Sequence, residues 1–216
     1  MPTISRLLVT KRFGLLVVVL ISGIAATAAA LWGRAHPPAP SLQTRMAEQL
    51  GEHGAEEWIG LQQRYGGRYS RNAEEWVVRD YFQDKRDGIF LDVGANDPRT
   101  ENNTYFLETA LGWSGIAIDA MGEFAADYTR FRPKTKFYAL FVSDVSDATE
   151  DFFVPEQGPL GATNNRAFAE RTGGYVDVRK VRTITLNDLL AHEKIAHVDF
   201  VSIDIVLAVK CVTPVG

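Results

Sequence analysis

Two aspartates stand at the ends of apolar runs in this 216-residue chain. Asp92 lies in the run IFLDV and is followed by a Gly-Ala-Asn loop, and Asp119 ends the run SGIAID about 25 residues after Gly94. A glycine at such a turn lets the backbone approach a ligand without an intervening Cβ. An acid at this separation is suited to hydrogen-bond the hydroxyls of a bound ribose. The pair therefore predicts a site for an adenosine-containing cofactor.

The loop after Asp92 does not have the spacing of a dinucleotide-binding turn. Gly94 is followed by Asn96 and Pro98, so the close-approach glycines of a GxGxxG motif are absent. A cofactor without a pyrophosphate fits this loop better, and a nucleotide-dependent oxidoreductase becomes a distant alternative. The helix expected next offers unpaired N–H groups to a ligand. A tight strand-to-helix turn with a purely structural Asp92 is the other interpretation.

A parallel sheet would bring these residues together, and the pattern of the chain predicts one. The predicted elements are a helix over 70–86, a strand over 89–93, a helix over 103–111, a strand over 114–119, a helix over 122–131, a strand over 136–144 and a strand over 198–205. Strands that alternate with helices indicate an α/β layer with right-handed crossovers. Ligands of such sheets bind at the carboxyl ends of the strands.

Composition excludes several classes of site. The formal charge of -4, the sequence pI of 5.6 and the lack of a basic run argue against a nucleic-acid partner. The single cysteine, Cys211, excludes an intrachain disulfide and a multi-cysteine metal site. Four scattered histidines have no zinc-ligand spacing, so no metal is predicted, although a site made of carboxylates stays open.

The N-terminal segment is predicted to be a membrane anchor. After a basic segment over 1–13, residues 14–32 carry no charge and are numerous enough to cross a bilayer as one transmembrane helix. A cleaved signal peptide with small residues over 28–30 is the alternative. A small excess of basic residues before the span favours a cytoplasmic N-terminus, with the rest of the chain on the other side of the membrane. The excess is too small to decide between the two orientations. A proline-rich linker over 33–42, short helices over 43–69 and a domain over 70–216 are expected next.

Several short motifs occur in a characteristic order. They are DVGAN (92–96), NTYFLE (103–108), GW (112–113), TLNDLL (185–190) and VDFVSIDI (198–205). With the residues around them, from about 70 to 205, they resemble the FkbM-type S-adenosylmethionine-dependent methyltransferases. The resemblance implies a Rossmann-like sheet of the class I methyltransferases, S-adenosylmethionine as the cofactor, and O-methylation of a sugar or other hydroxyl-bearing small molecule.

The resemblance also implies a role for each of several residues. Asp92, Gly94, Ala95 and Asn96 would line the methionine and ribose side of the cofactor. Asp119 would hold the ribose hydroxyls, and Ser143 and Asp144 would meet the adenine edge. The alternative for each aspartate and for the 143–144 pair is an ordinary cap or turn.

Two acids are candidates for the methyl-transfer step. The resemblance places Asp204 at the end of the fourth strand, and Glu74 in an SQxGED-like motif that here has Arg71 and Ala73 instead of glutamine and glycine. The methyl group is carried on a sulfonium leaving group, so the protein mainly positions a nucleophile and supplies a base when that nucleophile is a hydroxyl. A partly desolvated Asp204 with a raised pKa could accept the hydroxyl proton.

The end of the chain departs from the family pattern. After SIDI the family continues with an acid, whereas Val206 stands here and only about four parallel strands of the usual seven can be drawn. We therefore expect a C-terminally truncated member whose fourth strand is an open hydrophobic edge. Two interpretations follow: a membrane-anchored methyltransferase whose activity the shortened end puts in question, or a non-catalytic, membrane-anchored α/β interaction module derived from one.

Overall fold

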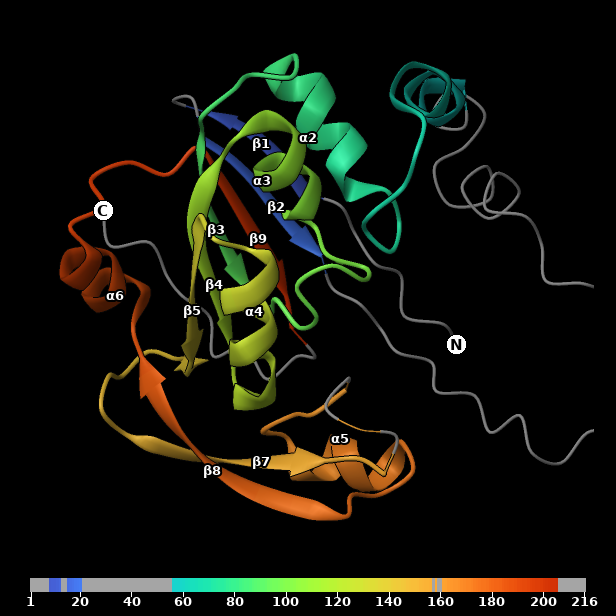
Figure 1. Ribbon diagram of the computed structural model, residues 1–216. Helices are drawn as coiled ribbons and strands as arrows, with labels where there is room; N and C mark the ends of the chain where they lie inside the picture. The colour runs from blue at the N-terminus through green and yellow to red at the C-terminus, as the bar shows by residue number, and fades with distance from the viewer. Residues whose placement is uncertain (1–7, 13–14, 21–55, 157, 159–160, 206–216) are drawn as a thin grey trace, which may run out of the picture.

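A six-stranded, mostly parallel sheet forms the centre of the molecule (Figure 1). The computed structural model describes residues 8–12, 15–20, 56–156, 158 and 161–205, with side chains from residue 56 onward. The sheet consists, in spatial order, of β1 (Leu8–Arg12), β2 (Leu15–Leu20), β9 (Phe200–Asp204), β3 (Ile89–Val93), β4 (Ser114–Asp119) and β5 (Thr135–Ala139). The five strands from β2 to β5 are parallel, and β1 is antiparallel to β2. The predicted α/β class with a parallel sheet is confirmed.

Helices cover both faces of this sheet, as near-continuous apolar strands require. On one face lie α2 (Glu74–Phe82), α3 (Tyr105–Leu111) and α4 (Ala125–Phe131), after the short 3-10 helix η1 (Gly122–Phe124). The core between α2, α3 and the sheet contains Val78, Phe90, Leu107, Leu111, Trp113 and Phe200. On the other face, α6 (Leu186–Glu193) places the buried Leu189 against strand residues Leu91, Val93, Ile116 and Ile118.

The first predicted helices differ from the observed ones in their ends. Residues 56–65 are helical, and the N–H of Gly66 closes that segment on the Gln62 carbonyl. The helix expected over 70–86 begins at Glu74 and ends at Phe82, because Gln83 adopts a left-handed conformation with φ of 51°. By contrast α3 ends as predicted, at Gly112.

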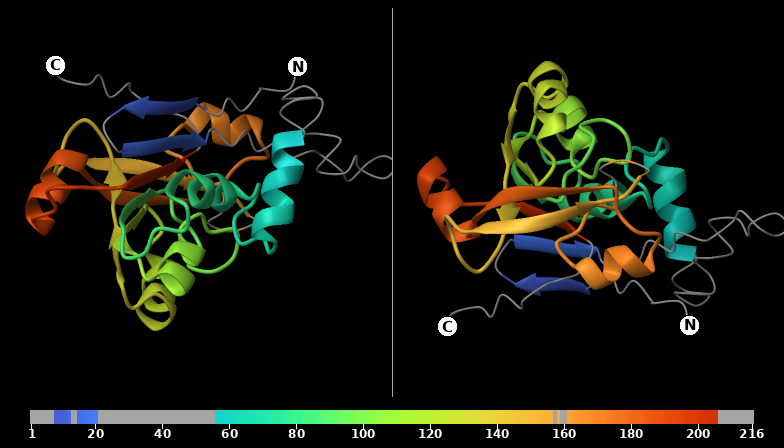
Figure 2. Two further views of the ribbon diagram at one scale, coloured as in Figure 1. Left: turned by 90° about the horizontal axis from the view of Figure 1, so that it is seen from above. Right: turned by 90° about the horizontal axis from the view of Figure 1, so that it is seen from below.

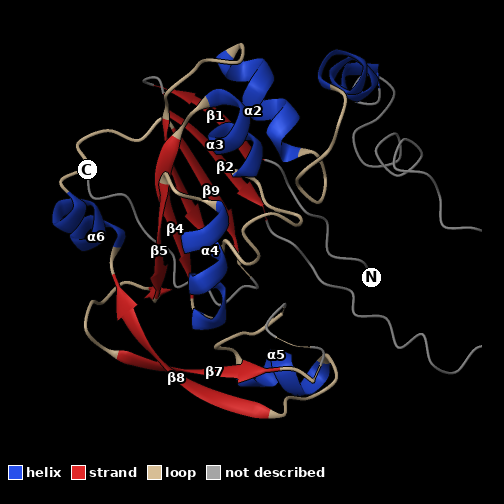
Figure 3. Ribbon diagram, viewed as in Figure 1, coloured by secondary structure: helices blue, strands red, loops and turns tan. Residues whose placement is uncertain are grey.

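A second, three-stranded sheet was not predicted. The expected strand over 136–144 divides at Leu140, and its second part, β6 (Phe141–Val142), pairs with β8 (Asp177–Ile184), which also pairs with β7 (Thr149–Val154). Figure 3 shows β7 and β8 crossing below the strand ends of the large sheet, with α5 (Arg166–Arg171) beside them. The second sheet therefore faces the edge at which ligands of α/β sheets bind.

The N-terminal prediction is wrong where the structure describes it. Residues 15–20 form β2 rather than part of a membrane helix, and β2 pairs in parallel with β9 (Figure 2). Three consecutive valines, over 17–19, favour an extended backbone because β-branched side chains are stiff at χ1. No helix among the described residues is long and apolar enough to cross a membrane. The rest of the predicted span, 21–32, and the linker over 33–42 lie outside the described residues.

Pairing with β2 also corrects the expectation of an open sheet edge. β9 has hydrogen-bonded neighbours on both sides, β2 and β3, so the fourth predicted strand lies inside the sheet. The large sheet accordingly has five parallel strands instead of about four. Residues 206–216, on which the expectation of a shortened domain rested, lie outside the described part of the chain.

Candidate active site

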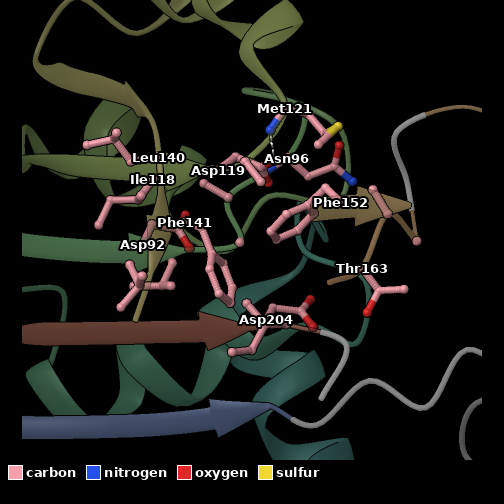
Figure 4. Close-up of a pocket in the computed structure, with 18 of the residues that line it drawn as sticks. Asp92, Asn96, Ile118, Asp119, Met121, Leu140, Phe141, Phe152, Thr163 and Asp204 are labelled. Carbon is pink, nitrogen blue, oxygen red and sulfur yellow. Dashed lines mark hydrogen bonds between the residues drawn. The ribbon is translucent and has the colours of Figure 1, made fainter. Parts of the chain in front are cut away.

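A pocket lies between the carboxyl edge of the large sheet and the second sheet (Figure 4). Its lining comes from the ends of β3, β4 and β9, from the segment around β6, from β7 and from residues 161–164. The chain runs from β3 to β4 on one side of β3, whereas β9 lies on the other side, so the direction of the connections reverses here. Such a switch point is where the crevice of an α/β sheet forms.

Asp119 is held in this pocket by the backbone. One carboxylate oxygen accepts a hydrogen bond from the Asn96 N–H at 2.9 Å, and the other accepts one from the Met121 N–H at 2.8 Å. Burial raises the pKa of Asp119, and these two backbone hydrogen bonds oppose that rise. A carboxylate has about four acceptor sites, so two remain for hydroxyl groups of a ligand.

Asp92 is held by side chains instead. Only 2% of its surface is exposed, and the Thr104 hydroxyl donates to one of its carboxylate oxygens at 2.9 Å. Burial raises the pKa of Asp92 to about 6, which hydrogen bonds from Thr104 and Ser202 and the charge of Arg132 hold down. The carboxylate is therefore predominantly ionised at neutral pH, and a modest change in its surroundings would neutralise it.

The loop 94–96 joins these two acids. The N–H groups of Gly94 and Ala95 both donate to the Ile118 carbonyl, at 2.8 and 3.1 Å, which ties the loop to the end of β4. Gly94 has φ of 76°, and a Cβ there would lie 2.0 Å from the backbone oxygen of Asp204. The glycine thus permits the close approach of β9, which brings Asp204 to the pocket.

The lining contains both apolar and acidic residues. Ile118, Leu140, Phe141, Val142 and Phe152 supply the apolar surface. The acidic side chains of the lining are Asp92, Glu101, Asp119 and Asp204. Among the described lining residues, Arg71 is the single cation, with its Nε 3.6 Å from a Glu101 carboxylate oxygen. The pocket therefore suits a ligand with a flat apolar part, hydroxyl groups and a positive charge.

Comparison with known proteins identifies the family. The model of the family described as "Methyltransferase FkbM domain" matches residues 92–205, which is more than half of the chain and contains both aspartates. The chain belongs to the FkbM methyltransferase family. Curated proteins gave no match.

A similar solved structure is the 1,6-didemethyltoxoflavin-N1-methyltransferase of Burkholderia thailandensis, which was crystallised with 1,6-didemethyltoxoflavin and S-adenosylhomocysteine. The two chains are 16% identical, with a TM-score of 0.27, and the match covers 76% of this chain and 82% of the other.

The cofactor that the FkbM family implies is S-adenosylmethionine, and the residues of the pocket fit it. The free acceptor sites of Asp119 match the two hydroxyls of a ribose. The apolar surface around Phe141 matches a purine ring, and the acidic side chains of the lining match a sulfonium and an ammonium group. The ribose, the adenine and the two positive groups of the cofactor thus have matching residues in the lining.

The structure brings six of the nine predicted site residues to the pocket of this FkbM domain. They are Asp92, Gly94, Ala95, Asn96, Asp119 and Asp204. Ser143 and Asp144 lie beyond the point where the strand divides, and the Ser143 N–H donates to the Ile184 carbonyl of the second sheet. The neighbouring Phe141 and Val142 line the pocket instead.

Glu74 is the third residue that the structure places elsewhere. Its carboxylate accepts hydrogen bonds from the backbone N–H and the side-chain amide of Asn72, at 2.9 and 2.8 Å. It therefore closes the first turn of α2, where an acid is favourable next to the helix N-terminus. Glu74 does not line the pocket.

A group of polar residues behind the loop that follows β3 was not predicted from the sequence. Asn102 is 1% exposed, and its side-chain amide donates to the carbonyls of Ala95 and Asp97, at 3.1 and 3.0 Å. Asn103 is also buried and donates to the Ser202 hydroxyl at 2.9 Å, from the loop to β9. A run of polar residues next to the predicted cofactor loop was the available signal, but their partners are distant in the sequence.

Proposed function

We propose that the chain is an S-adenosylmethionine-dependent methyltransferase that methylates a hydroxyl group of a sugar or other small molecule. The observation that carries the proposal is the Asp119 carboxylate, fixed by two backbone N–H groups at the edge of a pocket with an apolar wall. Membership in the FkbM family supports the reaction class.

The cofactor residues follow from the geometry of the pocket. Asp119 would accept hydrogen bonds from the ribose hydroxyls, and the surface formed by Leu140, Phe141 and Val142 would contact the adenine. Asp92 and the loop 94–96 would face the methionine part, whose positive groups a buried carboxylate attracts. When bound, the cofactor supplies a methyl group on a sulfonium leaving group.

Asp204 is the best-placed base for a hydroxyl acceptor. It ends β9 in the same pocket as Asp92, and Figure 4 shows it on the β9 side of the lining. An aspartate within hydrogen-bond reach of the acceptor hydroxyl would orient it and accept its proton as the methyl group transfers, which typically contributes a factor of about 100 to 10,000 in rate. Asn103 and Thr163 are further polar residues of the lining that could hold the acceptor.

The alternative, a non-catalytic docking module, has lost one of its two supports. It rested on Val206 in place of the family's acid and on an open edge of the fourth predicted strand, and β2 occupies that edge. The pocket at the carboxyl edge of the sheet also favours the methyltransferase interpretation, because a docking surface would not need one.

Calorimetry with S-adenosylhomocysteine and the full-length chain tests the proposal first. Micromolar binding is expected. Tritiated S-adenosylmethionine is then offered with a panel of sugars and hydroxylated small molecules. Asp204→Asn should retain the binding and lose methyl transfer by about 100-fold or more. Asp127→Ala, which removes an exposed acid of α4, is the matched control and should change neither. A folded wild-type chain that does not bind the ligand would refute the proposal.

A further inference from the structure

Arg132 follows α4 and carries a guanidinium with no exposed surface, although it does not line the pocket. We propose that Arg132 is a positioning residue of the cofactor site. Through Thr104 it orients the Asp92 carboxylate and favours its ionised form, and through Asn102 it holds the loop that follows β3, residues 94–98. The cofactor part of this inference rests on the proposed function.

The guanidinium uses all of its donors. Arginine has five N–H groups in a planar fork and no acceptor. Each of the five has an acceptor here: Glu108 Oε2, Pro98 O, Asn102 Oδ1, Thr104 Oγ1 and Thr135 Oγ1, at 2.6, 2.9, 2.9, 3.0 and 3.3 Å. Lysine has three donors from a single point and would leave several of these groups without a partner. The site is therefore specific for arginine.

The contact with Thr104 links Arg132 to Asp92 in the pocket. Because a guanidinium only donates, the Thr104 hydroxyl must accept from Arg132 at 3.0 Å. Its own proton is then directed away from Arg132, with the Asp92 carboxylate at 2.9 Å and the Asn102 side-chain oxygen at 3.1 Å as acceptors. An arginine–hydroxyl–carboxylate chain of this kind favours the ionised form of Asp92.

The contact with Asn102 links Arg132 to the loop that follows β3. The Asn102 side-chain oxygen accepts from Arg132 at 2.9 Å, which leaves its amide to donate to the carbonyls of Ala95 and Asp97. Arg132 also donates to the Pro98 carbonyl of the same loop at 2.9 Å. The loop from 95 to 98 is thereby fixed from behind by one side chain.

The charges around Asp92 support this assignment. Arg132 stabilises its anion, whereas Asp204 of β9 opposes it, and the Tyr128 hydroxyl of α4 is the further titratable group that faces it. Glu108 of α3 neutralises part of the Arg132 charge at 2.6 Å. Removal of either the Arg132 charge or the Thr104 hydroxyl should therefore raise the pKa of Asp92 and neutralise it nearer to neutral pH.

Two measurements on the full-length chain test the inference. The first follows the carboxyl carbon of Asp92 by NMR as a function of pH, without ligand. The second measures the dissociation constant of S-adenosylhomocysteine from pH 5 to 8 by calorimetry. Thr104→Val should raise the Asp92 midpoint by about one pH unit, since a hydrogen bond to a charged group is lost. It should also weaken binding at pH 7 by about twofold, because about half rather than nine-tenths of the Asp92 carboxyl groups would be ionised. Thr104→Ser should restore both values.

Arg132→Met should shift the Asp92 midpoint and the affinity for S-adenosylhomocysteine in the same directions as Thr104→Val, and by larger amounts. Trp113→Phe is the control for general destabilisation: it replaces a buried indole by a smaller ring and deletes the N–H that donates to the Lys85 carbonyl. Trp113 does not line the pocket, so the Asp92 midpoint should stay unchanged. If Arg132→Met does not fold, the Thr104 pair decides.

A wild-type midpoint and affinity in Thr104→Val would overturn the inference. If the wild type does not bind the ligand, the proposed function fails, and the NMR titration still decides whether Arg132 and Thr104 set the ionisation of Asp92.

Discussion

Asp92 and Asp119 belong to neighbouring parallel strands and face one pocket, but they are held in different ways. Two backbone N–H groups orient Asp119, so its position follows from the path of the chain. The Thr104 hydroxyl orients Asp92, with Arg132 behind it. A carboxylate fixed by backbone is insensitive to most substitutions, whereas one fixed by side chains has an adjustable charge. We therefore expect Asp119 to govern affinity and Asp92 to govern its pH dependence.

The largest effect is expected for Asp119→Ala. The substitution removes the proposed acceptors for two ligand hydroxyls and leaves the N–H groups of Asn96 and Met121 without their partner. Hydrogen bonds to charged groups contribute about 1.5–3 kcal/mol each, so the affinity for S-adenosylhomocysteine should fall by about 100-fold or more. Calorimetry measures it, with Asp127→Ala as the matched exposed control. An affinity within threefold of the wild type would assign Asp119 a purely structural role.

Asp92→Asn should stabilise the fold at neutral pH. The pKa of Asp92 is about 6 in the folded chain and near 3.8 without the fold, so between these values the folded state binds more protons than the unfolded one. The Asp92 contribution to stability is therefore favourable below pH 4 and is lost as the pH rises towards 6. The neutral amide avoids this loss, which amounts to about 3 kcal/mol at pH 7.5. Urea unfolding at pH 4 and 7.5 should show a gain at the higher pH only. An equal gain at both would contradict the assignment.

The same substitution should weaken cofactor binding. In the proposed function, the ionised Asp92 attracts the positive groups of the ligand at pH 7.5, and the neutral amide of the variant would not. We therefore expect an affinity loss of about 10-fold for Asp92→Asn. Below pH 6 the wild type should approach the variant, because its own carboxyl group becomes protonated. Parallel pH profiles for the two proteins would show that the charge of Asp92 does not contribute.

The smallest effect is expected for Glu74→Gln. The carboxylate of Glu74 is engaged with Asn72 at the first turn of α2 and does not line the pocket. Affinity for S-adenosylhomocysteine and methyl-transfer rate should both stay within about twofold of the wild type. The unfolding free energy should fall by about 0.3–1 kcal/mol, because a negative charge next to the helix N-terminus is lost. A large loss of rate with unchanged stability would return Glu74 to the reaction.

The two aspartates were predictable because a strand end next to a glycine is a local pattern. The position of Asp119 required only the run SGIAID and the separation from Gly94. Arg132 could not be found in this way, because its partners Pro98, Asn102, Thr104 and Glu108 come from other elements and nothing in the sequence pairs them. An arginine before a proline in the sequence looks like a solvated helix end.

The errors have the same physical origin. Residues 136–144 were predicted to form one strand because their apolar character is continuous. The chain instead leaves the large sheet at Leu140 and pairs with β8, and Ser143 and Asp144 therefore lie away from the pocket. Residues 15–20 read as part of a helix because an apolar run without charges is compatible with either structure. The pairing partner of β2, which decides the matter, is nearly the whole chain away.

That pairing has a consequence for how the molecule assembles. Leu16 and Phe200 are register partners, so β2 lacks one of its two neighbours until β9 has been synthesised. Contacts between such distant segments raise the contact order and require a long loop to close, which slows folding. The hairpin of β1 and β2 is local and forms early, and its addition to β9 belongs to the last steps, after β3 and β4 have paired. Half-assembled molecules would expose the β9 edge during that interval, which makes the late stage of folding the one most open to association between chains.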